Sequence, residues 1–229
     1  MPLRKLWPLA KRVLPEGQRK VLKKIAMKAL RITRRDVDYF YDGEFSTSPL
    51  RNKVWTGDFC KVIIETFNPA AVIDFGCGTG DILLPFEERG LSILGIDASC
   101  ANKKRSKIKE GNFLLFDLRN KYKSRRKYDL CFCFEVGEHI EERYSDTLIE
   151  NLTRPGSTIL FTASTSHEGI DHVNVKPHEW WIKKFQECNF EFNKQLTEAI
   201  QKEMRNIPGI QSWYVENLLV FKNTSCMYN

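Results

Sequence analysis

The sequence predicts an α/β protein with a doubly wound, mostly parallel sheet of seven strands. From residue 50 onward, short apolar runs alternate with segments of helical periodicity, as in chains that return to one sheet through helices. The apolar runs are continuous rather than alternating, which is typical of strands buried on both faces. A glycine-rich turn follows the first run, at the place where parallel sheets of this kind bind their ligands.

Residues 1–49 predict a basic amphipathic helical extension outside this sheet. The first 35 residues carry 12 lysines and arginines and one acidic residue, Glu16, although the whole chain has a net charge of only +7. Between residues 20 and 32, apolar and basic side chains separate onto opposite halves of a helical wheel, with Met27 as the exception. Such a helix either packs its apolar side on the domain or lies on an anionic membrane surface, and nucleic acid is a third alternative.

Residues 50–229 predict a single domain, and glycine and proline mark the ends of its elements. Gly90 ends one helix, and the Pro155-Gly156 pair stops another. Pro177 opens a third. The expected helices are 50–67, 81–90, 100–108, 141–152 and 177–188. The expected strands are 70–75, 91–97, 112–117, 128–135, 157–164, 190–196 and 213–222, the last two pairing as an antiparallel edge.

The composition indicates a globular chain with reduced cysteines. It is 42% hydrophobic, yet no apolar run reaches the roughly 18–20 residues that a membrane-spanning helix needs. The seven cysteines form no C-x-x-C pair, so neither a disulfide framework nor a zinc ribbon is indicated. Cys131 and Cys133 alternate along an apolar strand and are expected to pack in the core. We therefore expect a cytoplasmic protein, with peripheral membrane contact through residues 1–35 as a further option.

The glycine-rich turn lies within the stretch VIDFGCGTGD, residues 72–81. Gly76, Gly78 and Gly80 alternate after a strand that contains Asp74, and glycine lets a ligand lie directly against the main chain. A dinucleotide-binding G-x-G-x-x-G sequence would need its third glycine at position 81, which is an aspartate. The spacing therefore disfavours a nicotinamide dehydrogenase.

Acidic residues end the next two strands. Asp97 ends the second strand and Asp117 ends the third, so both are expected at the same edge of the sheet as the glycine turn. A carboxylate there can accept two hydrogen bonds from a ribose diol, and hydrogen bonds to charged groups contribute roughly 1.5 to 3 kcal/mol each. The turn and the acids together predict a site for a nucleoside.

This combination resembles motif I and the acidic strand ends of the class I S-adenosylmethionine-dependent methyltransferase superfamily. The resemblance covers about residues 50–222 and implies a Rossmann-like methyltransferase fold with S-adenosylmethionine as cofactor. It implies that Asp97 binds the ribose, that Asp117 reaches the adenine amino group, and that Leu118 covers the ring. The cofactor-binding residues that it implies are Asp74, Gly76, Cys77, Gly78, Gly80, Asp97, Ala98, Asp117, Leu118, Phe134 and Glu135.

The acceptor side is expected after the fourth and fifth strands. The stretch Glu135-Val-Gly-Glu138-His139 is similar to an E-V-x-E-H sequence that borders the methionine end of the cofactor in this superfamily. A polar loop beginning near residue 165 carries His172. We expect Glu138, His139 and His172 as catalytic residues, with a histidine as general base or substrate-orienting group, and a structural role is the alternative. The stretches DHVNVKPHEWW and WYVENLLVFK resemble methyltransferases of glycan and cell-envelope biosynthesis.

A metal site is a second interpretation of the same residues. Glu135, Glu138, His139 and His172 are similar, in type and order, to a magnesium site of methyltransferases that modify the terminal ribose 2′-hydroxyl of small RNAs. A related site occurs in some quinone-biosynthesis O-methyltransferases. Such an ion could bind a vicinal diol and lower its pKa. Since Mg²⁺ prefers oxygen ligands to histidine, our main expectation is a site without metal.

The sequence therefore predicts a methyltransferase that uses S-adenosylmethionine to methylate a small-molecule or carbohydrate hydroxyl. A glycan or envelope precursor is the expected acceptor class. An RNA ribose 2′-O-methyltransferase with a divalent metal such as Mg²⁺ is one alternative. A noncatalytic scaffold that binds S-adenosylmethionine is another.

Overall fold

The computed structural model describes residues 13–19, 21–22, 54–169 and 171–224, and the chain divides into two compact units, residues 1–51 and 52–229. In the first unit, residues 16–19, 21 and 22 are helical. The rest of the basic helix expected over residues 20–32 lies outside the described residues. The extension and its expected partners therefore stay predictions.

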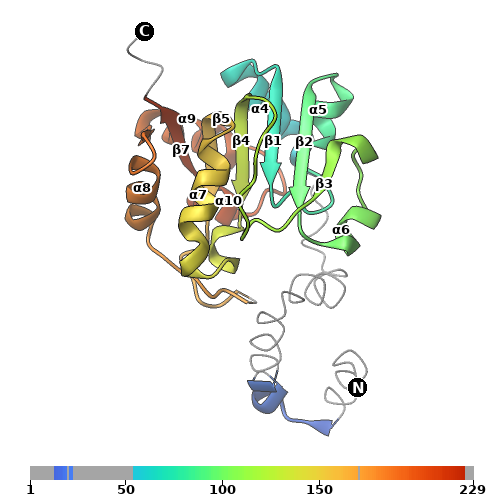
Figure 1. The fold of residues 1–229 in the computed structure, drawn as a ribbon, viewed down its shortest axis with the longest axis vertical. Helices are drawn as coiled ribbons and strands as arrows, with labels where there is room; N and C mark the ends of the chain where they lie inside the picture. The colour runs from blue at the N-terminus through green and yellow to red at the C-terminus, as the bar shows by residue number, and fades with distance from the viewer. Residues whose placement is uncertain (1–12, 20, 23–53, 170, 225–229) are drawn as a thin grey trace. The chain divides into compact units, whose positions relative to one another are not determined.

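The second unit is built on one sheet with the strand order β3-β2-β1-β4-β5-β7-β6 (Figure 1). All neighbouring strands run parallel except β7, which is antiparallel to both β5 and β6. This arrangement confirms the predicted seven-stranded, mostly parallel α/β fold. The strands are β1 (Ala71–Phe75), β2 (Ser92–Asp97), β3 (Phe113–Leu115), β4 (Tyr128–Phe134), β5 (Gly156–Thr162), β6 (Phe190–Phe192) and β7 (Leu219–Asn223).

Helices cover both faces of the sheet and bury two cores. On one face, Phe59 and Phe86 from α4 and α5 pack with Phe132 of β4. On the other face, α7 lies in front of the sheet in Figure 1, and the second core includes Cys131 and Cys133 as expected. The helices are α4 (Thr56–Phe67), α5 (Leu84–Glu88), α6 (Cys100–Lys104), α7 (Ser145–Thr153), α8 (His178–Gln186), α9 (Lys194–Arg205) and α10 (Ser212–Glu216).

The structure corrects the predicted elements near the C-terminus. The strand expected over 190–196 ends at Phe192, because the Asn193 side chain accepts a hydrogen bond from the Leu196 N–H at 2.9 Å and begins α9. Helix α9, which the sequence reading missed, buries Ile200 and Met204 in the first core. The strand expected over 213–222 begins only at residue 219, since its aromatic start folds into α10.

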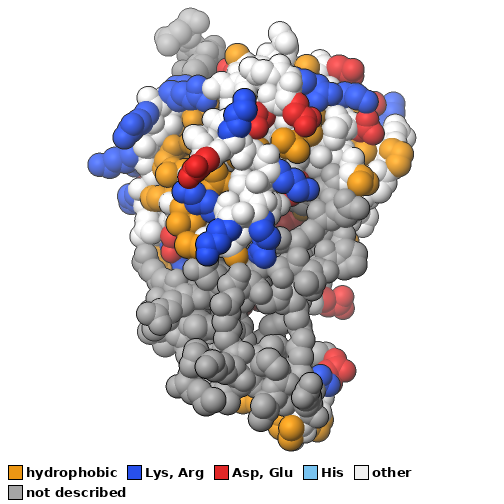
Figure 2. All heavy atoms as spheres, turned by 90° about the vertical axis from the view of Figure 1, so that its right-hand side faces the viewer, with side chains coloured by type: hydrophobic (Ala, Val, Ile, Leu, Met, Phe, Trp, Pro, Cys, Tyr) orange, Lys and Arg blue, Asp and Glu red, His pale blue; other side chains and the backbone are white. Residues whose placement is uncertain are grey.

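Two observations concern the surface of the described residues. No helix among them combines the length and the hydropathy that crossing a membrane requires. Figure 2 shows the side of the molecule on which α5, α6 and β3 lie, where lysine and arginine side chains are interspersed with acidic ones. Lys107, for example, pairs with Asp81 at 2.6 Å.

The carboxyl ends of β1, β2 and β4 point to the lower edge of the sheet in Figure 1. Register places the end of β2 beside both neighbours, since Asp74 pairs with Gly95 and Asp97 pairs with Leu115. The backbone N–H of Phe116 also donates to the carbonyl of Asp97 at 2.9 Å. The glycine turn and the acidic strand ends therefore meet at one edge, where the candidate site begins.

Candidate functional site

The glycine turn is held in a conformation that other residues rarely adopt. Gly76, Gly78 and Gly80 have φ values of +84°, +59° and +81°. The N–H groups of Gly76 and Cys77 both donate to the carbonyl of Ile96, at 2.7 and 3.0 Å, which ties the turn to β2. A Cβ on Gly78 would meet no heavy atom of the described residues within 4 Å. The main chain at Gly78 is therefore bare enough for a ligand to approach it.

Gly76→Ala is expected to destabilise the fold more than Gly78→Ala. Both changes put a Cβ on a left-handed residue, at a cost of about 1–2 kcal/mol. At Gly76 the new Cβ would also overlap Cγ2 of Val136, whose branched side chain has little freedom, adding about 1–3 kcal/mol. Thermal unfolding measures the difference, because each kcal/mol lowers the Tm of a domain of this size by about 2–4 °C. Equal Tm values for the two variants would contradict the Val136 contact.

The carboxylate of Asp97 joins the glycine turn to the start of α6. One oxygen accepts the Gly78 N–H at 2.9 Å. The other accepts the Ser99 N–H at 2.8 Å and the side-chain amide of Asn102 at 3.2 Å. Asp97 is 4% exposed, and Asp74 on the neighbouring strand is also buried. The structure thus places Asp97 directly against the glycine turn.

Asp117 is hydrogen-bonded by Arg119, a residue that the sequence analysis does not identify as part of the site. The backbone N–H of Arg119 donates to one Asp117 oxygen at 2.9 Å, and Nη2 donates to the other at 2.9 Å. Nε lies 3.0 Å from both oxygens. The neighbouring Leu118 side chain packs in the second core, so its expected contact with an adenine ring stays a prediction.

The end of β4 carries backbone strain at Glu135. This residue has a φ of +55°. Residues other than glycine rarely adopt such a value, and those that do are often found at functional sites. Its N–H donates to the carbonyl of Thr162 at 3.1 Å and to its hydroxyl at 2.9 Å. Its carboxylate accepts the side-chain amide of Asn217 at 3.3 Å. Of the other residues expected to bind cofactor, Cys77 and Phe134 are buried in the first core and Ala98 is half-buried.

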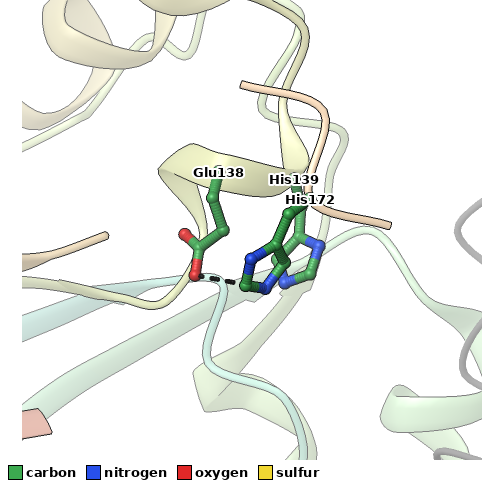
Figure 3. A group of neighbouring side chains, drawn as sticks. All are labelled: Glu138, His139 and His172. Atoms are coloured by element: carbon green, nitrogen blue, oxygen red, sulfur yellow. Dashed lines mark ion pairs between the residues drawn. The ribbon is translucent and has the colours of Figure 1, made fainter. Parts of the chain in front are cut away.

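Glu138, His139 and His172 form one cluster (Figure 3). One ligand atom from each lies within 4.8 Å of the others. Glu138 is fully buried, and neither of its carboxylate oxygens has a well-formed hydrogen bond within the described part of the chain. Nε2 of His172 lies 4.0 Å from one of these oxygens. The two imidazole rings meet edge to face, with centroids 5.0 Å apart. The structure thus brings all three predicted catalytic residues together.

Backbone carbonyls set the orientation of both histidines. Nδ1 of His139 lies 3.2 Å from the carbonyl of Asp171, and Nδ1 of His172 lies 2.6 Å from the carbonyl of Ser166. A carbonyl only accepts hydrogen bonds, so we assign the proton of each neutral imidazole to Nδ1. Each Nε2 then carries a lone pair, and that of His172 lies nearest Glu138.

The carboxyl of Glu138 lies in an unfavourable place for a charge. Burial raises its pKa well above the usual value, and the nearby carboxyl of Glu135 raises it further. Burial also raises the pKa of Glu135. A carboxyl whose pKa is higher in the folded state stabilises the fold fully at pH values below its unfolded pKa. That stabilisation is lost as the pH rises from about 4.5 through the folded pKa.

Glu138→Gln is therefore expected to stabilise the fold at pH 8 by about 1–3 kcal/mol, because an amide does not ionise and so avoids the free-energy cost that the raised pKa of the buried carboxyl imposes above pH 4.5. The gain should shrink as the pH falls toward 4.5. Urea unfolding at pH 5 and pH 8 measures it. The exposed Glu110, changed to Gln, is the matched control and should leave the pH dependence unchanged. If the stability of Glu138→Gln depended on pH as that of the wild type does, the raised pKa would not belong to this carboxyl.

Several contacts of the site were invisible to sequence reasoning. Arg119 begins a run of basic residues that is typical of solvated surface, although its side chain is only 5% exposed. Asn217 lies in the stretch that was predicted as a strand. Thr162 was hidden inside a regular apolar strand pattern. In contrast, His167, which lies in the same polar loop as His172, is exposed and stays outside the cluster.

Comparison with known proteins gives a consistent family. The profile of a family described as "Methyltransferase domain" matches residues 56–203. A ubiquinone biosynthesis O-methyltransferase of Rhodopseudomonas palustris (strain BisA53) is 36% identical over 76 residues, which are 31% of this chain and 30% of that protein. A protein of the same name from Rickettsia canadensis (strain McKiel) is 27% identical over 131 residues, 53% of this chain and 56% of that protein. The chain thus matches 56% or less of the length of these two relatives.

A solved structure supports the fold. The S-adenosylmethionine-bound amino pentose methyltransferase from Micromonospora echinaspora, involved in calicheamicin biosynthesis, matches with a TM-score of 0.57 and 12% identity. The match covers 81% of this chain and 97% of that one. At this identity the likeness shows a shared fold.

Proposed function

We propose that this chain, which belongs to the class I S-adenosylmethionine-dependent methyltransferase superfamily, transfers a methyl group from S-adenosylmethionine to a hydroxyl of a small molecule or sugar. The observation that carries the proposal is the placement of two groups at one sheet edge. The bare glycine turn, tied to Asp97, follows β1, and the cluster of Glu138, His139 and His172 follows β4 and β5.

The glycine turn and the acidic strand ends would hold the cofactor. Its sulfonium supplies an electrophilic methyl group. The main chain at Gly78 and the carboxylate of Asp97 would bind the nucleoside, with Asp117 toward the base. Methyl transfer by in-line displacement depends mainly on positioning and exclusion of water, so a rigid turn suits it. The hydrogen bonds of Gly76 and Cys77 to Ile96 supply that rigidity.

His172 would act as the general base. Its Nδ1–H is held by the carbonyl of Ser166, which leaves the Nε2 lone pair to accept the proton of an acceptor hydroxyl. The carboxyl of Glu138, 4.0 Å from that nitrogen, would stabilise the imidazolium that forms, because a neighbouring positive charge favours the ionised carboxylate. The Nδ1 atom of His139 is likewise held by a backbone carbonyl, that of Asp171, and His139 would orient the acceptor.

The same three residues also fit a divalent metal ion. Glu138 offers two buried carboxylate oxygens, and each histidine is held through Nδ1 by a carbonyl, as metal-bound histidines usually are. Glu135, the fourth expected ligand, lies outside this close group. Two imidazoles and a carboxylate suit Mn²⁺, Fe²⁺ or Zn²⁺ better than Mg²⁺. Bound there, such an ion would lower the pKa of a coordinated hydroxyl.

The similarity to O-methyltransferases of ubiquinone biosynthesis favours a hydroxyl of a small molecule as acceptor. A glycan or envelope precursor, as expected from the sequence, is a second acceptor class for the same site. An RNA ribose acceptor and a noncatalytic scaffold stay as alternative predictions.

Calorimetry and turnover together test the proposal. We expect the chain to bind S-adenosylmethionine and not NAD, and to form S-adenosylhomocysteine with members of a panel of catechols and sugars. Tight binding of NAD alone would overturn the methyltransferase assignment. Binding of S-adenosylmethionine without turnover on any acceptor, RNA 3′ ends included, would favour the scaffold.

Metal dependence is tested on the protein itself. If the cluster holds an ion, Co²⁺ added to chelator-treated protein should give a visible absorption band that His139→Ala abolishes, and EDTA should remove turnover that Mn²⁺ restores. Full turnover in EDTA together with no Co²⁺ band would leave His172 as the base without metal.

A further inference from the structure

We propose that Arg119 is a positioning residue for adenine recognition, which it achieves by fixing the carboxylate of Asp117. This inference rests on the proposed function, since it assigns a role within the expected cofactor site. Arg119 follows β3 and lies in the polypeptide between the adenine-side acid and β4. Its side chain is 5% exposed, against 23% for that of Asp117.

The geometry of the pair is specific. The guanidinium meets Asp117 through Nε and Nη2, and the backbone N–H of Arg119 adds a third donor, all at 2.9–3.0 Å. Two parallel donors on two oxygens fix the plane of a carboxylate, which a single lysine ammonium does not do. Burying a guanidinium costs desolvation free energy, so its near-complete burial beside a partly exposed acid points to orientation as its role.

The loop around this pair is itself fixed. Asn151 of α7 is buried, and its side-chain oxygen accepts the N–H of Tyr122 at 2.7 Å. Its amide donates to the carbonyls of Leu118 and Asn120 at 3.1 and 2.9 Å. The hydrogen bonds hold the chain on both sides of Arg119. The Asp117 carboxylate is therefore set in place before a ligand arrives.

A carboxylate offers about four acceptor positions. The three donors of Arg119 make four hydrogen bonds to the two oxygens, because the Nε proton is shared between them. A shared proton does not fill an acceptor position on either oxygen, and the Asp117 side chain is 23% exposed, so an adenine amino group can still donate to the carboxylate. Hypoxanthine presents a carbonyl oxygen instead, which a carboxylate repels. A fixed carboxylate would therefore select adenine over hypoxanthine.

Arg119 also approaches the acceptor side. Its Nη1 lies 3.9 Å from the carboxylate of Glu141, two residues beyond His139. The guanidinium thus lies between the expected adenine-side acid and the turn that carries Glu138 and His139. The contacts with Asp117 bear on selection of the base, and base selection is therefore the property to measure.

The experiment compares S-adenosylhomocysteine with S-inosylhomocysteine by calorimetry on the full chain. The wild type should prefer the adenine ligand by about 10-fold or more. Arg119→Met should reduce this ratio to below about 3-fold, and Arg119→Lys should also lose most of it, because lysine keeps the charge and lacks the fork. Asp117→Asn should lose the preference as well, and combining it with Arg119→Met should cause little further change. The exposed Arg125, changed to Met, is the control.

The outcomes separate the inference from the proposed function. If the wild type binds neither ligand, the proposed function itself is overturned. If it binds both equally, or if Arg119→Lys and Arg119→Met keep the wild-type ratio, Arg119 does not position Asp117 for the base. A lower Tm with an unchanged ratio would show that the pair serves the fold alone. If Arg119→Met fails to fold, the ratio of Arg119→Lys decides.

Discussion

Replacing Asp97 with alanine is expected to weaken binding of S-adenosylhomocysteine by about 10- to 100-fold. Hydrogen bonds from a ribose to a charged carboxylate contribute roughly 1.5 to 3 kcal/mol, and 1.4 kcal/mol is a factor of ten in affinity. The loss should be larger still if the turn moves, because the same carboxylate accepts the N–H groups of Gly78 and Ser99. Calorimetry on the folded variant measures the change.

Asp97→Asn is the matched control for the shape of the site. The amide keeps one acceptor oxygen and the size of the side chain, so its affinity should fall between those of the wild type and the alanine variant. Circular dichroism and Tm establish that each variant is folded. Wild-type affinity in a folded Asp97→Ala protein would remove this carboxylate from the cofactor site.

The fold and the glycine turn could be predicted because their signals are local. Continuous apolar runs predict the buried strands. The glycine turn is recognised from the spacing of Gly76, Gly78 and Gly80, which lie close together in the sequence. The C-terminal elements were misread for the opposite reason. The stretch from Trp213 has the aromatic content of a strand. It folds into α10 because its apolar side chains pack in the first core in that conformation.

The cluster of Glu138, His139 and His172 was predicted through its resemblance to a superfamily, and the fold then brought a distant histidine to the other two. Arg119 shows what neither route supplies. The basic residues around it in the sequence predict a solvent-exposed side chain. Only the folded loop shows that the guanidinium is buried and paired with Asp117. Whether a charge lies inside or outside depends on the path of the backbone, which composition does not encode.

His172→Ala is expected to lower turnover by about 10²- to 10⁴-fold, the usual contribution of a positioned general base. Affinity for S-adenosylhomocysteine should stay within about twofold of wild type, because the cluster lies after β4 and β5 while the cofactor contacts expected at Gly78 and Asp97 lie after β1 and β2. Turnover and calorimetry on the same preparation measure the two effects separately.

The chain offers a matched histidine for this experiment. His167 lies in the same loop but is exposed and outside the cluster, so His167→Ala should keep wild-type turnover. Full turnover in His172→Ala would show that the acceptor-side assignment is wrong, even if the cofactor site is right. A large loss in both variants would mean that the loop as a whole, rather than the Nε2 atom near Glu138, controls the reaction. Loss in His172→Ala alone is the result that a single oriented imidazole requires, since of these two histidines only His172 lies beside the buried carboxyl of Glu138.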